Sequence, residues 1–175
     1  MGVCMGRGRG ERIGIVQFHR NAQEKGICGD FEERWKNSHT KKELIDMAMD
    51  VKGADYLCDA IAKGWGISPM EIKSQFGQFI NGVYKPRMKG YTSEMYCCYK
   101  GSILAETTLI TVVESKMTIT IPQYHICEIF ATGECELEIR GEGQCTIVAY
   151  GNYDDVVIKA DTQVRCKRIQ KIERD

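Results

Sequence analysis

The spacing of hydrophobic and polar positions changes near residues 85–90. Before this point apolar residues recur at helical spacing, as at Tyr56, Leu57, Ala60 and Ile61. From Thr92 onward, β-branched and aromatic residues form runs of five to seven that end at Gly, Asn or Asp, which is typical of strands. We therefore predict an α+β protein, in which a small N-terminal helical bundle precedes a C-terminal antiparallel β-rich region of sandwich, barrel-like or solenoid-like form. The expected divisions are an arm or first strand (1–28), a helical subdomain (29–84) and a β-rich subdomain (92–172).

Capping signals set the expected helix starts. Thr40 and Glu43 form a T-x-x-E capping box, and Ser68-Pro69 with Glu71 supplies an N-cap, a proline at the first helical position and a second box. Gly64 is a stop signal for the helix before it. Helices are thus expected over about 30–35, 41–49, 54–63 and 69–80.

Eight strands are expected in the second half. A weak repeat runs through them, because Cys127, Cys135 and Cys145 each lie six residues before a glycine and two before an apolar residue. Free cysteine packs as a small hydrophobe, so we interpret the three thiols as buried strand starts. The expected strands are 93–99, 107–114, 117–121, 125–130, 135–140, 145–150, 155–160 and 164–170.

The zero net charge conceals an uneven layout. The chain has 24 Lys+Arg and 24 Asp+Glu, which argues against a protein that coats nucleic acid. Residues 1–25 carry five bases and two acids, and residues 51–100 carry seven bases and four acids. Residues 101–150 carry two bases and seven acids.

No apolar run approaches the roughly 20 residues of a membrane span, and the N-terminus lacks a signal-like apolar run. We expect no membrane association, and a cytoplasmic protein, possibly of a host cell, with free thiols among its nine cysteines.

Two basic segments are candidate binding sites. The Gly-Arg arm presents guanidinium groups that suit phosphate, and the segment at the helix-to-strand junction alternates bases with aromatic residues, as grooves for single strands do. A solvated terminus and a charged linker are the alternative interpretations. The candidate residues are Arg7, Arg9, Arg12, Tyr84, Lys85, Arg87, Lys89 and Tyr91.

A candidate acidic face lies on the strand 135–140 and just before it. Glu134, Glu136 and Glu138 alternate, so their side chains point the same way. Such a row could mimic DNA, or it could be the solvated face of a sheet.

No motif assigns a catalytic residue, a metal or a cofactor. The cysteines lack the two close ligand pairs of a zinc site, and nucleophile-elbow, phosphate-loop and dinucleotide patterns are missing. The residual possibility of an activity is a thiol–imidazole pair of His125 and Cys127, which lacks a third, orienting group. We therefore expect a protein that is not an enzyme and uses no cofactor.

Six segments of the chain, at 41–48, 53–58, 64–68, 79–82, 90–93 and 121–129, carry a resemblance to known proteins. They resemble small uncharacterised proteins of gut Bacteroidales phages and related mobile elements. The resemblance implies a phage or prophage accessory protein. Since the uneven charge suits partner choice, we expect a protein that binds and inhibits a host defence or nucleic-acid-processing component, with a host or phage protein as its partner. A nucleotide or single-stranded nucleic-acid binder and a structural virion protein are the alternatives.

A homo-oligomer is also expected, because the strands 107–114 and 117–121 have few charges and would pair if they lay at an edge.

Overall fold

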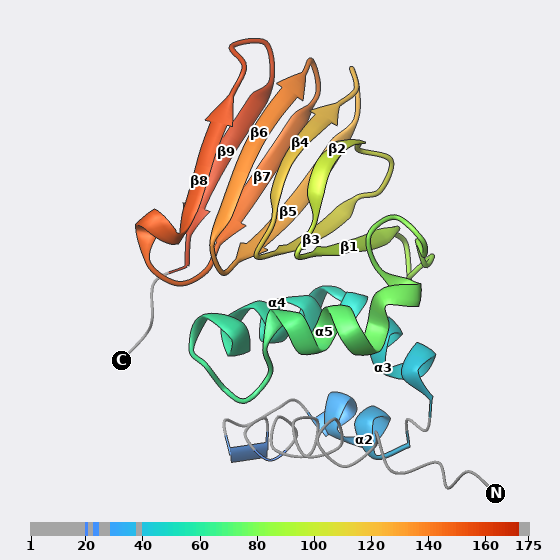
Figure 1. The fold of residues 1–175 in the computed structure, drawn as a ribbon. Helices are drawn as coiled ribbons and strands as arrows, with labels where there is room; N and C mark the ends of the chain where they lie inside the picture. Colours follow the sequence, from blue (N-terminus) through green and yellow to red (C-terminus); the bar gives the residue numbers. More distant parts are fainter. Residues whose placement is uncertain (1–19, 21–22, 25–28, 38–39, 172–175) are drawn as a thin grey trace, which may run out of the picture.

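A layer of helices lies beneath a β-solenoid (Figure 1). The computed structural model describes residues 20, 23–24, 29–37 and 40–171. The predicted arm at 1–28 therefore lies almost wholly outside the described residues. The helices are α2 (Gly29–Asn37), α3 (Lys41–Met49), α4 (Val51–Ala62) and α5 (Pro69–Phe76), followed by the 3-10 turn η1 (Gly77–Phe79).

Both predicted capping boxes are confirmed. The Thr40 hydroxyl accepts from the Glu43 amide at 3.2 Å, and the Glu43 carboxylate accepts from the Thr40 amide at 2.9 Å. Ser68 and Glu71 pair in the same way at the start of α5. Helix α4 begins three residues earlier than predicted, because the Asp50 side chain accepts from the Lys52 amide and caps it.

Within the described residues, nine strands form two sheets, and every pairing between these strands is parallel. One sheet has five strands in the order β1-β3-β5-β7-β9, and the other has four in the order β2-β4-β6-β8. A further 3-10 turn, η2 (Tyr153–Asp155), precedes β8. The strands are β1 (Ser93–Cys97), β2 (Lys100–Leu104), β3 (Leu109–Val113), β4 (Lys116–Ile121), β5 (Ile126–Thr132), β6 (Cys135–Gly141), β7 (Gln144–Ala149), β8 (Val156–Ala160) and β9 (Arg165–Gln170).

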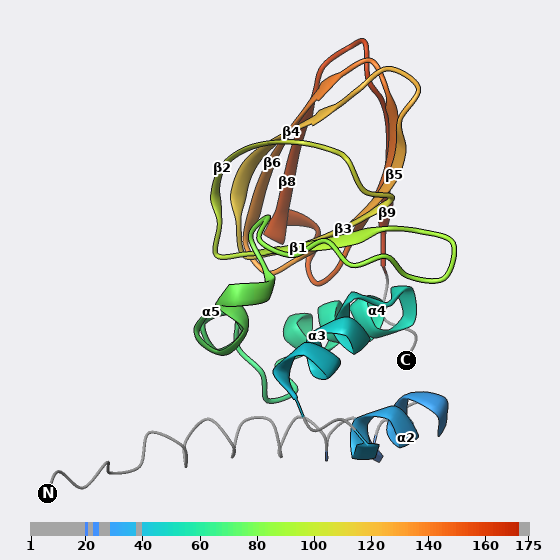
Figure 2. The same cartoon turned by 90° about the vertical axis from the view of Figure 1, so that its right-hand side faces the viewer.

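The prediction of antiparallel strands is therefore wrong, and the solenoid-like form is the one observed. Each coil places one strand in each sheet, so strands consecutive in the sequence face each other instead of pairing (Figure 2). Alternation of apolar and polar residues within a strand is the same for both pairings, so the pattern could not distinguish them. The strands 107–114 and 117–121 correspond to β3 and β4, which are interior strands, whereas β8 and β9 lie at sheet edges.

The solenoid interior is built from columns of aligned side chains. Ile110, Ile129 and Ile147 stack in register and are fully buried. The same column begins at Glu94 on β1 and ends at Arg168 on β9, so charged residues stand at both ends of an apolar column. The thiols of the predicted repeat are buried as expected, and Cys127 and Cys145 align with Cys166 in a second column.

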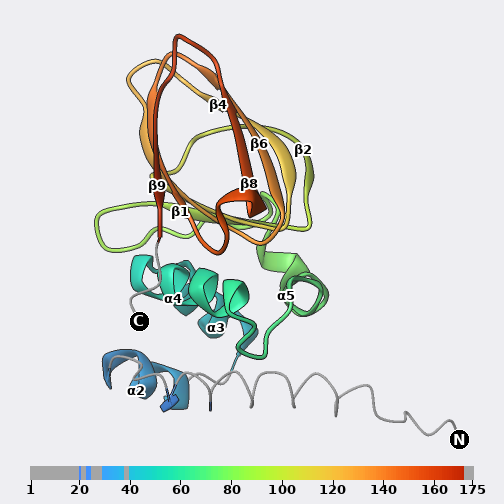
Figure 3. The ribbon, with the colours of Figure 1, turned by 90° about the vertical axis from the view of Figure 1, so that its left-hand side faces the viewer.

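The helices cover only one of the two sheets. Met95, Cys97 and Val113 pack with residues of α3, α4 and α5 in one core cluster, and Leu109 and Phe130 pack with Ala54 and Cys58 of α4 in another. Figures 2 and 3 show these helices below β1 and β3, while no described helix lies over the outer face of β2, β4, β6 and β8. Among the helices of the described ranges, none combines the length and apolar character needed to cross a membrane.

Candidate functional site

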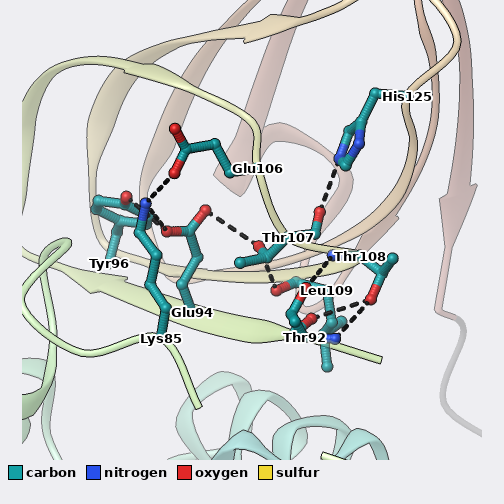
Figure 4. Close-up of polar contacts among 9 residues, drawn as sticks. All are labelled: Lys85, Thr92, Glu94, Tyr96, Glu106, Thr107, Thr108, Leu109 and His125. Carbon is teal, nitrogen blue, oxygen red and sulfur yellow. Dashed lines mark hydrogen bonds and ion pairs between the residues drawn. The ribbon is translucent and has the colours of Figure 1, made fainter. Parts of the chain in front are cut away.

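A cluster of polar side chains closes the N-terminal end of the solenoid (Figure 4). Lys85 reaches from the segment before β1 and lies 3.4 Å from the Glu94 carboxylate and 2.9 Å from that of Glu106. The hydrogen bond to Glu106 raises the pKa of Lys85, and the same contact lowers the pKa of Glu106. The ammonium group is therefore held charged between two carboxylates.

Glu94 is the buried member of this cluster. Its side chain is 0% exposed, and its oxygens accept hydrogen bonds from the Tyr96 hydroxyl at 3.0 Å and the Thr107 hydroxyl at 3.1 Å. A buried carboxylate is tolerated when it is paired and hydrogen-bonded, and both conditions hold here. The charged groups of the cluster are thus paired with one another, and the cluster lies at the end of the apolar core of the solenoid.

Several side chains of the predicted basic segment form contacts within the fold. The Tyr84 hydroxyl donates to the Asp46 carboxylate at 2.6 Å, and the Tyr91 hydroxyl accepts from the Val51 amide at 2.8 Å. Lys85 is exposed but lies between two acids, and the other two bases of the segment, Arg87 and Lys89, are exposed as well. The arm residues of the same prediction lie outside the described part of the chain; they are Arg7, Arg9 and Arg12.

The thiol and the imidazole of the predicted pair have separate surroundings. A ring nitrogen of His125, Nε2, lies 2.9 Å from the Thr107 carbonyl oxygen. Cys127 points into the core, and burial raises its pKa to about 12, which disfavours the thiolate that a nucleophile needs. Cys166 in the same column has its pKa lowered to about 7 by a hydrogen bond with Cys145. Sequence spacing could not reveal this pair, because 21 positions separate the two thiols and only the strand register aligns them.

The predicted acidic face is a face of mixed charge. Glu136 forms a salt bridge with Lys116 at 2.7 Å, and Glu138 forms one with Arg140 at 2.7 Å. These contacts lower the pKa of each glutamate. Glu134 is exposed just before β6. Bases on neighbouring positions thus offset the negative charge that the sequence of this strand suggested.

The outer face of the four-stranded sheet carries these residues in rows. Lys100, Lys116 and Glu136 align in one row, and Ser102, Thr118 and Glu138 align in the next, where Lys159 completes it. Between the rows lies a shallow hollow of about 470 Å³. The polar positions of β4 are visible in the sequence, whereas their alignment with β2 and β6 depends on pairings 16 and 20 residues apart.

Within the described ranges, no group of three or more His, Cys, Asp or Glu side chains is arranged to hold a metal ion. Comparisons of the chain with protein-family models, curated proteins and solved structures found no match.

Proposed function

We propose that the protein is a non-enzymatic interaction protein whose partner binds the outer face of β2, β4, β6 and β8. The observation that carries this proposal is the unequal covering of the two sheets, because helices pack against one and no described helix covers the other (Figures 2 and 3). Solenoids expose extended faces of this kind, and repeat proteins use such faces for binding.

The charges of this face favour a protein partner over a nucleic acid. A nucleic-acid surface is dominated by bases that contact phosphates, whereas here Lys116 and Arg140 are already paired with glutamates. Rows that hold both signs can match a protein surface of complementary pattern and fix its orientation. The phage context and the host defence target belong to the same proposal and rest on the sequence resemblance.

The proposal is tested by placing a large side chain in the hollow. Thr118→Arg projects a guanidinium group from the middle of β4 into the hollow between the rows. We expect the tagged wild-type chain to retain a stoichiometric partner from lysates of infected cells, and the variant to lose it by roughly tenfold, the effect of losing one central contact of about 1.4 kcal/mol.

Thr146→Arg is the matched control, because Thr146 lies on the outer face of the other sheet, on β7. Retention of the partner by the Thr118 variant, or its equal loss from both variants, would contradict the proposed surface. Binding of a single-stranded oligonucleotide that weakens steeply with salt would favour the nucleic-acid alternative. Light scattering that shows a defined multimer in place of a partner complex would favour the structural virion alternative.

A further inference from the structure

Three sulfur atoms meet where the first coil leaves the helical layer. Cys97 ends β1, Cys98 follows it at the corner, and Met70 lies in the first turn of α5. The Cys98 Sγ atom lies 4.0 Å from the Cys97 Sγ atom and 4.0 Å from the Met70 Sδ atom. Since 28 residues separate Met70 from Cys98, the fold creates this cluster and no sequence motif announces it.

The two distances from the Cys98 sulfur match two edges of a three-sulfur coordination triangle. An ion at the centre of a planar triangle, with metal–sulfur bonds of about 2.3 Å, separates its sulfur ligands by about 4.0 Å. Thiolate and thioether ligands together select soft cations such as copper(I), while zinc prefers four nitrogen or sulfur ligands without a thioether. We propose that Met70, Cys97 and Cys98 form a binding site for a soft monovalent cation, copper(I) being the probe of choice.

The backbone around the cluster holds both thiols in place. The Cys97 amide donates to the Asn81 side chain at 2.9 Å, and its thiol donates to the Pro69 carbonyl at 3.2 Å, which points the sulfur toward α5. Cys98 has a left-handed backbone with a φ of 49°, and its amide donates to the Val113 carbonyl at 3.0 Å. Such a conformation is strained for a residue with a side chain, so the corner fixes where the second thiol points.

The cluster is accessible from one side. Cys97 is buried and Cys98 is half-buried, while Met70 is 64% exposed. A hollow of about 740 Å³ lined by Met70, Cys98 and Tyr99, among others, leads to the two outer sulfurs. An ion can therefore enter from solvent and end against the buried thiol.

Binding exchanges protons for the ion. The Cys97 thiol donates a hydrogen bond to the Pro69 carbonyl, so it carries its proton in the free protein. Each thiol loses its proton to solvent as its sulfur binds the ion, and no electron is transferred. Two thiolates and one monovalent cation leave one negative charge, and the Lys73 ammonium group lies 3.4 Å from the Cys98 carbonyl oxygen to offset it.

The test uses the full chain, reduced and free of oxygen, titrated with copper(I) against a chromogenic copper(I) chelator. We expect one tightly bound equivalent and an X-ray absorption spectrum with three sulfur neighbours at about 2.3 Å. Cys98→Ser removes the bridging sulfur and should weaken binding by about 100-fold, and Met70→Leu should weaken it by about tenfold and leave two sulfurs.

Two controls separate this site from other sulfurs. Met88→Leu makes the same change at a methionine outside the cluster. Cys166→Ser removes one thiol of the pair on β7 and β9. Neither variant should change the affinity for the one tightly bound equivalent of copper(I). Circular dichroism of the metal-free variants establishes that they are folded. Affinity unchanged in both cluster variants, or loss of the tight equivalent in the Cys166 variant, would overturn the assignment, as would a Cys97–Cys98 disulfide that resists mild reductant.

Discussion

The thiols of the inner column Cys127, Cys145 and Cys166 differ in pKa because of burial and because of the hydrogen bond between Cys145 and Cys166. Burial raises the pKa of Cys127, while the hydrogen bond with Cys166, followed by burial, raises the pKa of Cys145. Cys166 is half-buried on the edge strand β9, and the Cys145 thiol donates to it, which favours the thiolate. The end of the column is therefore the place where thiol chemistry is easiest.

We predict that Cys166 is alkylated faster at neutral pH than the other thiols of the described ranges. Its rate should rise as pH increases through about 7 and level off above, because the pKa lowered to about 7 makes the thiolate dominant there. Iodoacetamide labelling followed by peptide mass spectrometry measures this. In Cys145→Ala, which removes the donor, the rise should move to higher pH; a profile identical to that of the wild type would refute the proposed donor.

A second residue-scale prediction concerns Lys85. Lys85→Met leaves Glu94 buried without its cation, so the free energy of unfolding should fall by about 1–3 kcal/mol in urea titrations. Glu106→Gln removes only the exposed partner and should lower the free energy of unfolding far less than Lys85→Met does.

The double variant Lys85→Met with Glu94→Gln tests the cause of the Lys85 effect. It removes the buried charge together with its partner, so most of the lost stability should return. Equal losses in the Glu106 variant and the Lys85 variant would show that the exposed contact carries the stability instead.

At the scale of elements, the corners of the coil depend on glycine. Gly141 ends β6 with a φ of 101°, and a Cβ atom there would collide with the Ile121 carbonyl of the neighbouring coil. Gly141→Ala should therefore lower the free energy of unfolding by about 2 kcal/mol or more. Gly77→Ala is the control, because Gly77 has a helical φ of −52° and an open surrounding, and it should be neutral or slightly stabilising. Equal effects of the two substitutions in thermal unfolding would count against this account.

The elements with local signals could be found from the sequence, and those without could not. Two capping boxes and eight strands were predicted close to their observed positions because caps and alternation are encoded within a few residues. Strand β2 was missed because Lys100, Gly101 and Ser102 carry no apolar side chain; the Tyr99 ring packs over Gly101 in place of one. The 3-10 turn at Gly77 likewise ended α5 before the expected Ile80.

The candidate sites show the same limit. Lys85 was singled out for its sign, but its partners Glu94 and Glu106 come from other parts of the first coil. Met70 and Cys98 meet through the packing of α5 against β1. The register of the parallel strands determines which of these residues become neighbours, and this register cannot be predicted from a local sequence pattern.

At the scale of the whole molecule, the solenoid is closed differently at its two ends. At the first coil, the Asn81 side chain bonds to both the amide and the carbonyl of Cys97 and so satisfies the edge of β1. At the last coil, Arg168 crosses the end of the core: its guanidinium donates to the carbonyls of Val156 at 2.9 Å and Tyr153 at 2.6 Å and stacks on the Tyr153 ring. This side chain connects β9 to β8 where no further described coil covers them.

Loss of the Arg168 closure should therefore open the last coil without unfolding the rest. Arg168→Met keeps the apolar stem but removes two charge-assisted hydrogen bonds of about 1.5 kcal/mol or more each, so amides of β8 and β9 should exchange with deuterium at least tenfold faster. In a stacked architecture each coil contacts its neighbours alone, so exchange in β3 and β4 should stay at the wild-type rate. Arg165→Met removes the same charge from the exposed face of the same strand and should leave both regions unchanged. A uniform acceleration across all strands would mean that the solenoid unfolds as one cooperative unit and that Arg168 stabilises the whole of it.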